Sequence, residues 1–331
     1  MGSISGAGMR TCVIGAGLAG LTAARHAHAA GFEVTVLDKG RGLGGRMATR
    51  RTADGFVFDH GAQYFTVRTP DFKALVTEAI KDRALALWAP ADEAHRPPTT
   101  GSNDPWYVGC PGMSGLAKWL ARSLDVRTGT TVTGLTRASG RWHVETTDDG
   151  WSDDFDRIVV AIPAPQAQTL LSGIVDINAR LSAVSVDPCW AVLAGFEQPL
   201  KKLPAVYRSE TTPIGRVARN GTKMGRPPEH EAVVVHMNPE WSTAYLEHTP
   251  EDVSAMALIF LGKMWPELPG PPSYLSAHRW RYARTRVPLG APFISSADGS
   301  LLVGGDWCLG ARVECAYESG AAIGKALASR A

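Results

Sequence analysis

The chain has 331 residues, of which 44% are hydrophobic and 20% are charged, and its formal net charge is +2. This length and composition predict a globular protein of two domains, and the near-neutral charge gives no reason to expect nucleic-acid binding. The five cysteines are scattered without a C-x-x-C pair, which argues against a zinc site or a disulfide framework and favours a reducing compartment.

The sequence has no recognisable targeting or membrane signal. Residues 1–9 lack the basic start and the apolar core of a signal peptide. No uncharged apolar run approaches the roughly twenty residues that a membrane span needs. We therefore expect a cytoplasmic protein with no membrane partner, and the oligomeric state stays open.

The N-terminal segment matches the dinucleotide-binding fingerprint Gly-x-Gly-x-x-Gly. An apolar strand ends at Gly15, a helix is predicted over 18–30, and a second strand leads into Asp38. Gly15 permits the tight turn, Gly17 lets a pyrophosphate approach the helix N-terminus, and Gly20 lets the helix and the strand pack closely. Asp38 can accept hydrogen bonds from an adenosine ribose. These features predict a bound dinucleotide, either FAD or NAD.

Two further segments favour FAD. A second glycine-rich loop over 39–46 ends in Arg46, which offers a positive charge to a phosphate, and such a loop is typical of FAD proteins of the glutathione-reductase and amine-oxidase type. Near the C-terminus, a strand over 301–303 leads to Asp306 and then to a helix over 314–329. Asp306 would bond the ribityl chain, and the backbone N–H groups of Val313 and Glu314 would face the flavin pyrimidine. An ordinary closing β–α unit is the alternative.

The middle of the chain alternates helical and strand patterns. Helices are expected over 71–88, 113–124 (with Ser114 as N-cap) and 251–264, and a loop over 90–105. Residues 56–65 are expected to form a strand that runs into a tight turn. Further strands are expected over 130–136, 141–147, 158–162, 187–192, 232–236 and 276–283, with a turn at 148–150. The continuous apolar run 158–162 predicts a buried parallel strand. The last strand would place His278, Trp280 and Tyr282 on one face, which lines either a core or a pocket.

A basic segment rich in proline and glycine lies between two of these strands. It carries Arg208, Arg216, Arg219, Lys223 and Arg226. The ordinary interpretation is a solvated loop. The sharper one is a site for a phosphate-bearing substrate.

Several motifs together resemble the renalase family, particularly its bacterial members. They are the fingerprint at 13–20, Asp38-Lys39, Gly44-Gly45-Arg46-Met47, Gly61-Ala62-Gln63-Tyr64, Pro163-Ala164-Pro165-Gln166, Asp187-Pro188, Trp190-Ala191, His278-Arg279-Trp280 and Gly305-Asp306-Trp307. The resemblance runs through nearly the whole chain. The Gly-Ala-Gln-Tyr and His-Arg-Trp motifs are its most specific parts.

The resemblance implies an α/β fold, in which a Rossmann-like FAD-binding domain of the glutathione-reductase/amine-oxidase type carries an inserted mixed α+β substrate domain. The expected boundaries are 1–65, 106–165 and 285–331 for the FAD domain, and 66–105 and 166–284 for the substrate domain. The expected FAD contacts are Gly15, Ala16, Gly17, Ala19, Gly20, Asp38, Lys39, Gly45, Arg46, Gln63, Tyr64, Val132, Asp306 and Val313.

The resemblance also implies the activity. Renalases oxidise the 2- and 6-dihydro isomers of NAD(P)H by passing a hydride to flavin N5, and O2 then reoxidises the flavin and gives H2O2. This chemistry needs no protein base and no metal, so no catalytic residue is assigned, but the protein must hold a flat ring against the flavin and exclude water. The candidates for substrate binding are Tyr64, Trp190, Arg219, His236, Trp280 and Tyr282, with Lys223 or Arg226 as alternatives to Arg219.

Three other functions remain open on the sequence. A flavin amine oxidase often has a lysine near flavin N5, which Lys223 or Lys263 would have to supply. A flavin-binding protein without turnover would stay yellow with every donor. An NAD-dependent dehydrogenase would be colourless, and the second glycine-rich loop argues against it.

Overall fold

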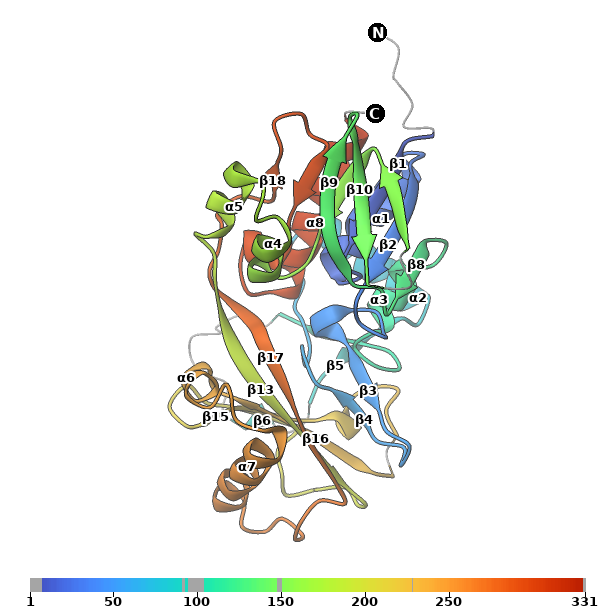
Figure 1. Ribbon diagram of the computed structural model, residues 1–331. Helices are drawn as coiled ribbons and strands as arrows, with labels where there is room; N and C mark the ends of the chain where they lie inside the picture. Colours follow the sequence, from blue (N-terminus) through green and yellow to red (C-terminus); the bar gives the residue numbers. More distant parts are fainter. Residues whose placement is uncertain (1–7, 91–92, 95–103, 148–150, 228, 330–331) are drawn as a thin grey trace.

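The computed structural model describes residues 8–90, 93–94, 104–147, 151–227 and 229–329. Figure 1 shows two lobes. Two long strands, β13 (Ser185–Phe196) and β17 (Tyr274–Val287), run from the upper lobe into the lower one. Among the described residues, no helix combines the length and the apolar character that a membrane span requires.

The upper lobe is built on a six-stranded sheet in the order β18-β19-β12-β1-β2-β8. These strands are β18 (Ile294–Ser295), β19 (Leu301–Val303), β12 (Arg157–Val160), β1 (Arg10–Ile14), β2 (Glu33–Asp38) and β8 (Asp125–Thr128). All neighbours pair in parallel except β18 with β19. This sheet confirms the Rossmann-like fold and the parallel strand expected at 158–162.

Side chains of this sheet alternate between two cores, which is why its central strands β12, β1 and β2 are largely apolar. Val13 and Val159 belong to the core that also contains α1 (Leu18–Ala29) and α8 (Val313–Ala328). On the other face, Cys12 and Ile158 pack with Trp142 from a three-stranded antiparallel sheet. That sheet consists of β9 (Val132–Ala138), β10 (Arg141–Thr146) and β11 (Ser152–Phe155).

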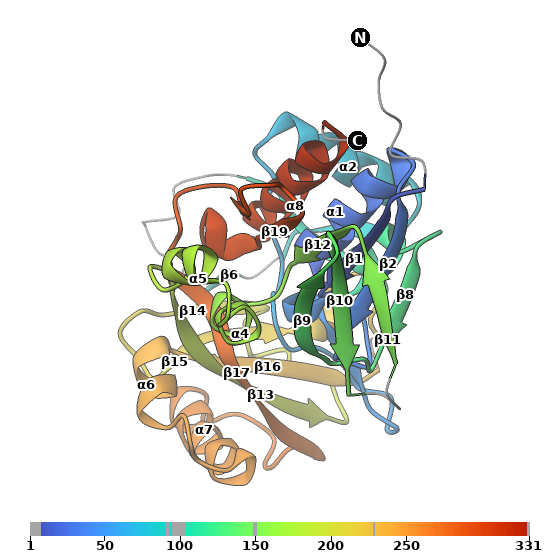
Figure 2. The same ribbon diagram turned by 45° about the horizontal axis from the view of Figure 1, so that its top comes forward.

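The helices α1 and α8 lie side by side, as Figure 2 shows. A Cβ atom at Gly320 would lie 2.3 Å from the carbonyl oxygen of Ala19, so this close packing requires glycine. Helix α2 (Pro70–Lys81) packs on the same core, with Phe72 stacked on Tyr317 at 4.8 Å between ring centroids.

The lower lobe has its own six-stranded sheet, in the order β17-β13-β16-β15-β14-β6. The remaining strands are β16 (Glu231–Met237), β15 (Ile214–Arg219), β14 (Val206–Arg208) and β6 (Glu93–Ala94). The pairs are antiparallel except β14 with β6. Two helices, α6 (Pro239–Ala244) and α7 (Pro250–Met264), cover one face.

Smaller elements complete the structure. They are β3 (Thr49–Arg51) with β4 (Val57–Asp59), β5 (Leu85–Trp88) with β7 (Trp106–Gly109), and the helices α3 (Gly115–Leu120), α4 (Ala164–Leu170) and α5 (Val175–Leu181).

Some expected elements were wrong in extent. The helix expected over 71–88 ends at Lys81 because Arg83 adopts a left-handed backbone conformation (φ 57°), and the chain continues as β5. The helix expected over 113–124 is confined to α3. Most of the loop expected over 90–105 and the turn at 148–150 lie outside the described residues.

We propose the division into a flavin domain and a substrate domain on the basis of these two sheets. One segment departs from the expected boundaries. Residues 70–81 were expected in the substrate domain, but α2 packs on α8 in the core of the upper lobe. We therefore propose to place α2 in the flavin domain.

Candidate active site

A large cavity of about 2440 Å³ lies between the two sheets. Its upper wall consists of the loops at the carboxyl ends of β1 and β2 and the turn before α8, and its lower wall of residues from β13, β15, β16 and β17. Ligands of open parallel sheets bind at the carboxyl ends of the strands. A cavity for one drug-sized ligand measures about 300–1,000 Å³, so this cavity has room for a dinucleotide and a second molecule.

The glycine fingerprint forms a backbone cradle at one end of the cavity. Gly15 has φ +110°, and its N–H donates to the carbonyl of Leu37 at 2.7 Å. A Cβ at Gly20 would lie 1.9 Å from the carbonyl oxygen of Gly15, whereas a Cβ at Gly17 would meet no described atom within 4 Å. Gly20 therefore serves packing, and Gly17 leaves space in front of the N-terminus of α1, where a pyrophosphate fits.

Asp38 fastens the two glycine-rich loops together. Its carboxylate accepts from the N–H of Ala16 at 2.6 Å and from the N–H of Gly40 at 2.6 Å. The N–H of Gly44 donates to the carbonyl of Ala16 at 2.9 Å. Asp38 and Lys39 also line the cavity. We therefore propose that Asp38 binds the ribose of a dinucleotide in addition to these backbone N–H groups.

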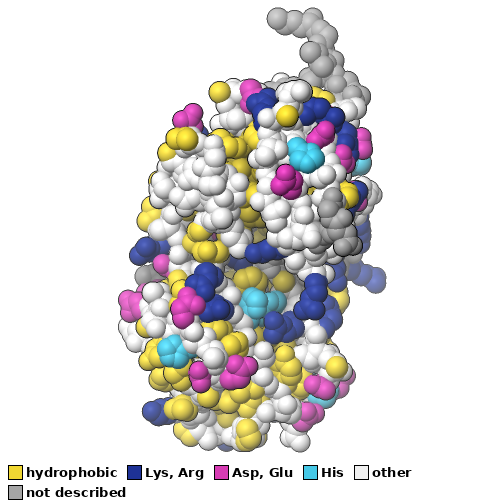
Figure 3. Space-filling model, viewed as in Figure 1, with side chains coloured by type: hydrophobic (Ala, Val, Ile, Leu, Met, Phe, Trp, Pro, Cys, Tyr) yellow, Lys and Arg dark blue, Asp and Glu magenta, His cyan; other side chains and the backbone are white. Residues whose placement is uncertain are grey.

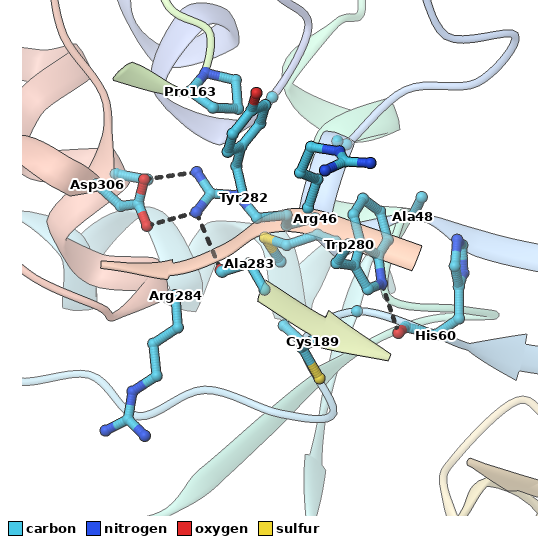
Figure 4. Close-up of a pocket in the computed structure, with 18 of the residues that line it drawn as sticks. Arg46, Ala48, His60, Pro163, Cys189, Trp280, Tyr282, Ala283, Arg284 and Asp306 are labelled. Atoms are coloured by element: carbon cyan, nitrogen blue, oxygen red, sulfur yellow. Dashed lines mark hydrogen bonds and ion pairs between the residues drawn. The ribbon is translucent and has the colours of Figure 1, made fainter. Parts of the chain in front are cut away.

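The far end of this groove is formed by Arg46, Asp306 and the start of α8. The Arg46 guanidinium donates to the Asp306 carboxylate at 2.9 and 2.5 Å and to the carbonyl of Ala283 at 3.2 Å, as Figure 4 shows. Val313 is the first residue of α8 and lines the cavity. The buried carboxylate of Glu314 accepts hydrogen bonds from the backbone N–H groups of Arg68 and Thr69, at 2.8 and 2.7 Å.

These residues fit a flavin dinucleotide. The space at Gly17 and the N-terminus of α1 suit the phosphates of such a cofactor. The side chains of Arg46 and Asp306 suit its phosphate and ribityl groups, and the N-terminus of α8 suits its pyrimidine oxygen. Gly15, Gly17, Ala19, Gly45 and Val132 all line this part of the cavity.

Three of the expected cofactor contacts do not line the cavity. Ala16 and Gly20 are buried within the turn and the helix. Gln63 is 1% exposed, and its side-chain amide donates to the carbonyl of Asp59. Their role in this structure is to shape the loops that line the cavity.

Aromatic and histidine side chains line the lower part of the cavity. They are His60, Tyr64, His236, His278, Trp280 and Tyr282. Trp280 stacks on His60 with 5.1 Å between ring centroids. The carbonyl of His60 bonds to Nε1 of Trp280 at 2.9 Å and to Nε2 of His236 at 3.1 Å, which holds β4, β16 and β17 together at this point.

The imidazoles of this cluster are neutral at physiological pH. Burial lowers the pKa of His60 to about 3, and that of His236 and of His278 to about 4. Neighbouring cations act in the same direction, Arg50 on His60 and His278, and Arg216 on His236. The cluster therefore offers flat, uncharged, hydrogen-bonding surfaces.

Tyr64 packs against an aromatic ring and two guanidinium groups. Its ring lies 4.0 Å from the Trp106 ring, and its hydroxyl accepts a hydrogen bond from Arg208. The guanidinium carbons of Arg208 and Arg216 lie 5.0 and 5.7 Å from the Tyr64 ring.

Two expected substrate residues were wrong because they face away from the cavity. Trp190 is 1% exposed, and its Nε1 donates to the carbonyl of Tyr245 in the core beneath α6 and α7. Strand residues alternate between faces, and it is the preceding Cys189 that lines the cavity. Arg219 is buried in an ion pair with Glu231, at 2.7 Å between Nε and Oε2.

The alternatives Lys223 and Arg226 are also buried outside the cavity. Both cations bind the carboxylate of Asp59, which is 0% exposed. Asp59 also accepts from the N–H of Met113 at 2.8 Å. These donors hold the pKa of Asp59 at about 2, against the effect of burial. The cluster links β4 to the segment after β15 and is structural.

The sequence interpretation missed His60 and undervalued Arg208 and Arg216. The basic segment is not all loop, since Arg208 lies on β14 and Arg216 on β15, and both line the cavity. Of the described residues that line the cavity, thirteen are Lys or Arg and five are Asp or Glu. Figure 3 shows basic side chains gathered around a histidine at the hollow between the lobes.

Known families match most of the chain. Residues 13–79 match the NAD(P)-binding Rossmann-like domain, and residues 99–323 match the flavin containing amine oxidoreductases. Renalase of Mus musculus is 25% identical over 292 residues, which cover 83% of this chain and 85% of that protein.

Solved structures share the fold. A putative protoporphyrinogen oxidase from Exiguobacterium sp. 255-15 has a TM-score of 0.77 at 15% identity, covering 98% of this chain and 100% of that one. Cyclohexylamine oxidase from Brevibacterium oxydans IH-35A has a TM-score of 0.76 at 14% identity, covering 97% and 99%. The chain belongs to the flavin containing amine oxidoreductases, as a renalase-like oxidoreductase with a flavin cofactor.

Proposed function

We propose that this protein is an FAD-dependent oxidase of the 2- or 6-dihydro isomers of NAD(P). The observation that carries the proposal is the chemistry of the cavity wall, where neutral imidazoles and aromatic rings lie among an excess of basic residues. A wall of this kind suits a flat ring joined to phosphates, because guanidinium groups bind phosphate oxygens and aromatic faces bind the ring.

The protein's part in the reaction is to bind and orient. When bound, FAD supplies a hydride acceptor at N5 and is reoxidised by O2 to give H2O2. The loops around Gly17, Arg46 and Asp306 would hold the cofactor along the upper wall. Trp280, Tyr282 and Tyr64 would hold the nicotinamide ring against it and exclude water. His60 and His236, both neutral, would keep this surface polar without adding charge.

An amine substrate fits this wall less well. A cationic amine would meet a predominantly basic lining. Neither lysine considered for an amine oxidase lines the cavity as described, since Lys223 Nζ binds Asp59 and Gln63, and Lys263 lies on the exposed side of α7.

The test is anaerobic stopped-flow mixing of the flavin-loaded protein with a mixture of 2- and 6-dihydro-NAD(P) isomers, and separately with normal NADH and a simple amine. We expect rapid bleaching of the flavin by the isomers alone, and H2O2 when air is admitted. Bleaching by the amine instead would make the protein an amine oxidase. No bleaching by any donor would favour a flavin-binding protein without turnover.

A variant at the wall extends the test. His236→Ala removes the imidazole that lines the cavity and bonds to the carbonyl of His60. We expect slower flavin reduction with FAD still bound. Reduction kinetics identical to those of the unmodified protein would remove His236 from the site.

A further inference from the structure

Arg216 is a partly buried cation that has no counterion among the residues described by the structure. It lies on β15 with its side chain at the cavity wall. Its guanidinium makes no hydrogen bond or ion pair with any residue that the structure describes, and its Nε is buried without a partner. The guanidinium carbon lies 5.7 Å from the centroid of the Tyr64 ring. A guanidinium withdrawn from bulk water ordinarily has an anionic or carbonyl partner.

Arg208 lies directly opposite Arg216 on the neighbouring strand. The two residues are register partners in the antiparallel pair β14–β15. Arg208 also has a buried Nε without a partner, and its terminal nitrogen donates to the Tyr64 hydroxyl. Burial and the charge of Arg216 lower the pKa of Arg208 to about 10, and burial also lowers the pKa of Arg216. Because a guanidinium keeps its charge in proteins, both groups are cations. Two adjacent cations repel each other, and a bound anion would offset this cost.

The remaining charged groups near the pair do not neutralise it. Arg284 of β17 adds a third positive charge to the surroundings of Arg216. Burial raises the pKa of the Cys189 thiol to about 12, so this neighbour stays uncharged. Glu210 and Glu240 also line the cavity, and neither forms an ion pair with Arg208 or Arg216 in the part of the chain that the structure describes.

We propose that Arg216 and Arg208 bind a phosphate group of the hydride donor. This inference rests on the proposed function and adds to it the residues that would bind the phosphate of the dihydronicotinamide substrate. The phosphates of the cofactor would have a separate place, at Gly17 and the N-terminus of α1 in the upper lobe. Besides its proposed contact with the nicotinamide ring, Tyr64 would orient Arg208, because its hydroxyl accepts a hydrogen bond from that guanidinium.

The experiment compares a donor without phosphate with donors that carry one phosphate or a pyrophosphate, and the dinucleotide also carries an adenosine. The flavin-loaded protein is mixed anaerobically with 2-/6-dihydro isomers of the nicotinamide riboside, of the mononucleotide and of the dinucleotide. Flavin bleaching against donor concentration gives a Kd and a limiting rate for each. We expect the phosphate-bearing donors to bind about 10- to 100-fold more tightly than the riboside, which is the range of charge-assisted contacts. A Kd that falls from the riboside to the mononucleotide indicates that one phosphate is bound. A Kd that falls only from the mononucleotide to the dinucleotide indicates that the pyrophosphate is bound.

Arg216→Gln is expected to remove most of this preference, and Arg216→Lys to keep part of it. Arg122→Gln is the matched control, because Arg122 is an exposed arginine paired with Asp82 away from the cavity. An equal loss of preference in the control would assign the effect to net charge and overturn the inference. If Arg216→Gln does not fold, a competition experiment with inorganic pyrophosphate and the unmodified protein takes the place of the variant. The added pyrophosphate should raise the apparent Kd of the dinucleotide and leave the Kd of the riboside unchanged.

A binding measurement separates the two proposals. ADP-ribose carries the pyrophosphate and cannot donate a hydride, and adenosine is its phosphate-free counterpart. We expect calorimetry to show ADP-ribose binding that is lost in Arg216→Gln, and no binding of adenosine. If the isomers fail to bleach the flavin while ADP-ribose still binds through Arg216, the oxidase function is wrong and the phosphate site stands. If the isomers bleach the flavin and the riboside, the mononucleotide and the dinucleotide all have the same Kd, the phosphate site is wrong and the oxidase function stands.

Discussion

Arg46 and Asp306 lie 260 positions apart in the chain and form an ion pair with two hydrogen bonds, at 2.9 and 2.5 Å. Arg46 belongs to the short helical turn after the second glycine-rich loop, and Asp306 to the turn before α8. The pair therefore joins the N-terminal and C-terminal parts of the flavin groove. Each partner was expected to contact the cofactor by itself, and the structure adds that they contact each other.

Arg46→Ala should weaken flavin retention. The change removes a cation from the groove and leaves the largely buried carboxylate of Asp306 without its guanidinium partner. Charge-assisted contacts of this kind contribute about 1.5–3 kcal/mol, so we expect the flavin Kd to rise by about tenfold or more. The ratio of flavin to protein absorbance after gel filtration measures it, with Arg46→Lys as the charge-conserving control. Full flavin occupancy in Arg46→Ala would contradict a role in cofactor binding.

Gly17→Ala and Gly20→Ala should separate cofactor binding from folding. The new Cβ at position 17 would meet no described atom, and the φ of −76° suits alanine. It would, however, occupy the space where a pyrophosphate approaches the backbone. The Cβ at position 20 would lie 1.9 Å from a backbone oxygen. We expect Gly17→Ala to keep the melting temperature of the apoprotein and lose flavin, and Gly20→Ala to lower that melting temperature. Equal melting temperatures for both variants would refute this assignment.

The sequence predicted the flavin half of the molecule well because its signals are local. The turn at Gly15, the helix that follows it and the acid at the end of β2 all lie within 24 residues of one another, and each requirement follows from backbone geometry. The strand before α4 was equally clear, because its residues 158–160 are buried and apolar on both faces of the sheet.

The substrate half could not be predicted in the same way. Arg216 and Arg219 lie on one strand, three positions apart, and strand alternation places them on opposite faces. Which face meets the cavity depends on partners far away in the sequence, such as Glu231 for Arg219. The sequence offered Lys223 and Arg226 as substrate ligands. In the structure both bind Asp59, which lies more than 160 positions earlier in the chain.

Asp59→Asn should destabilise the whole protein. Asp59 is the shared anion of two buried cations, and removing its charge leaves Lys223 and Arg226 unpaired at 0% and 1% side-chain exposure. Breaking a buried ion pair from one side costs about 3–5 kcal/mol. We expect a melting temperature lower by several degrees in calorimetry, with Asp82→Asn as the control, because Asp82 forms an exposed ion pair. A melting temperature unchanged by Asp59→Asn would show that the cluster is not structural.

Stability should fall as the pH is lowered from about 6.5 to about 4, because of the histidine cluster. An unfolded histidine has a pKa near 6.5, whereas the folded pKa is about 4 for His236 and for His278 and about 3 for His60. Between these values the unfolded chain binds more protons than the folded one, so the free energy of unfolding rises with pH in this window. Urea unfolding of the apoprotein at pH 7.0, 6.0 and 5.0 measures the slope above the range where most carboxylates titrate. His236→Gln should reduce the slope, and the same change at the exposed His28 should leave it unaltered. A slope insensitive to His236→Gln would mean that this imidazole is not held neutral by the fold.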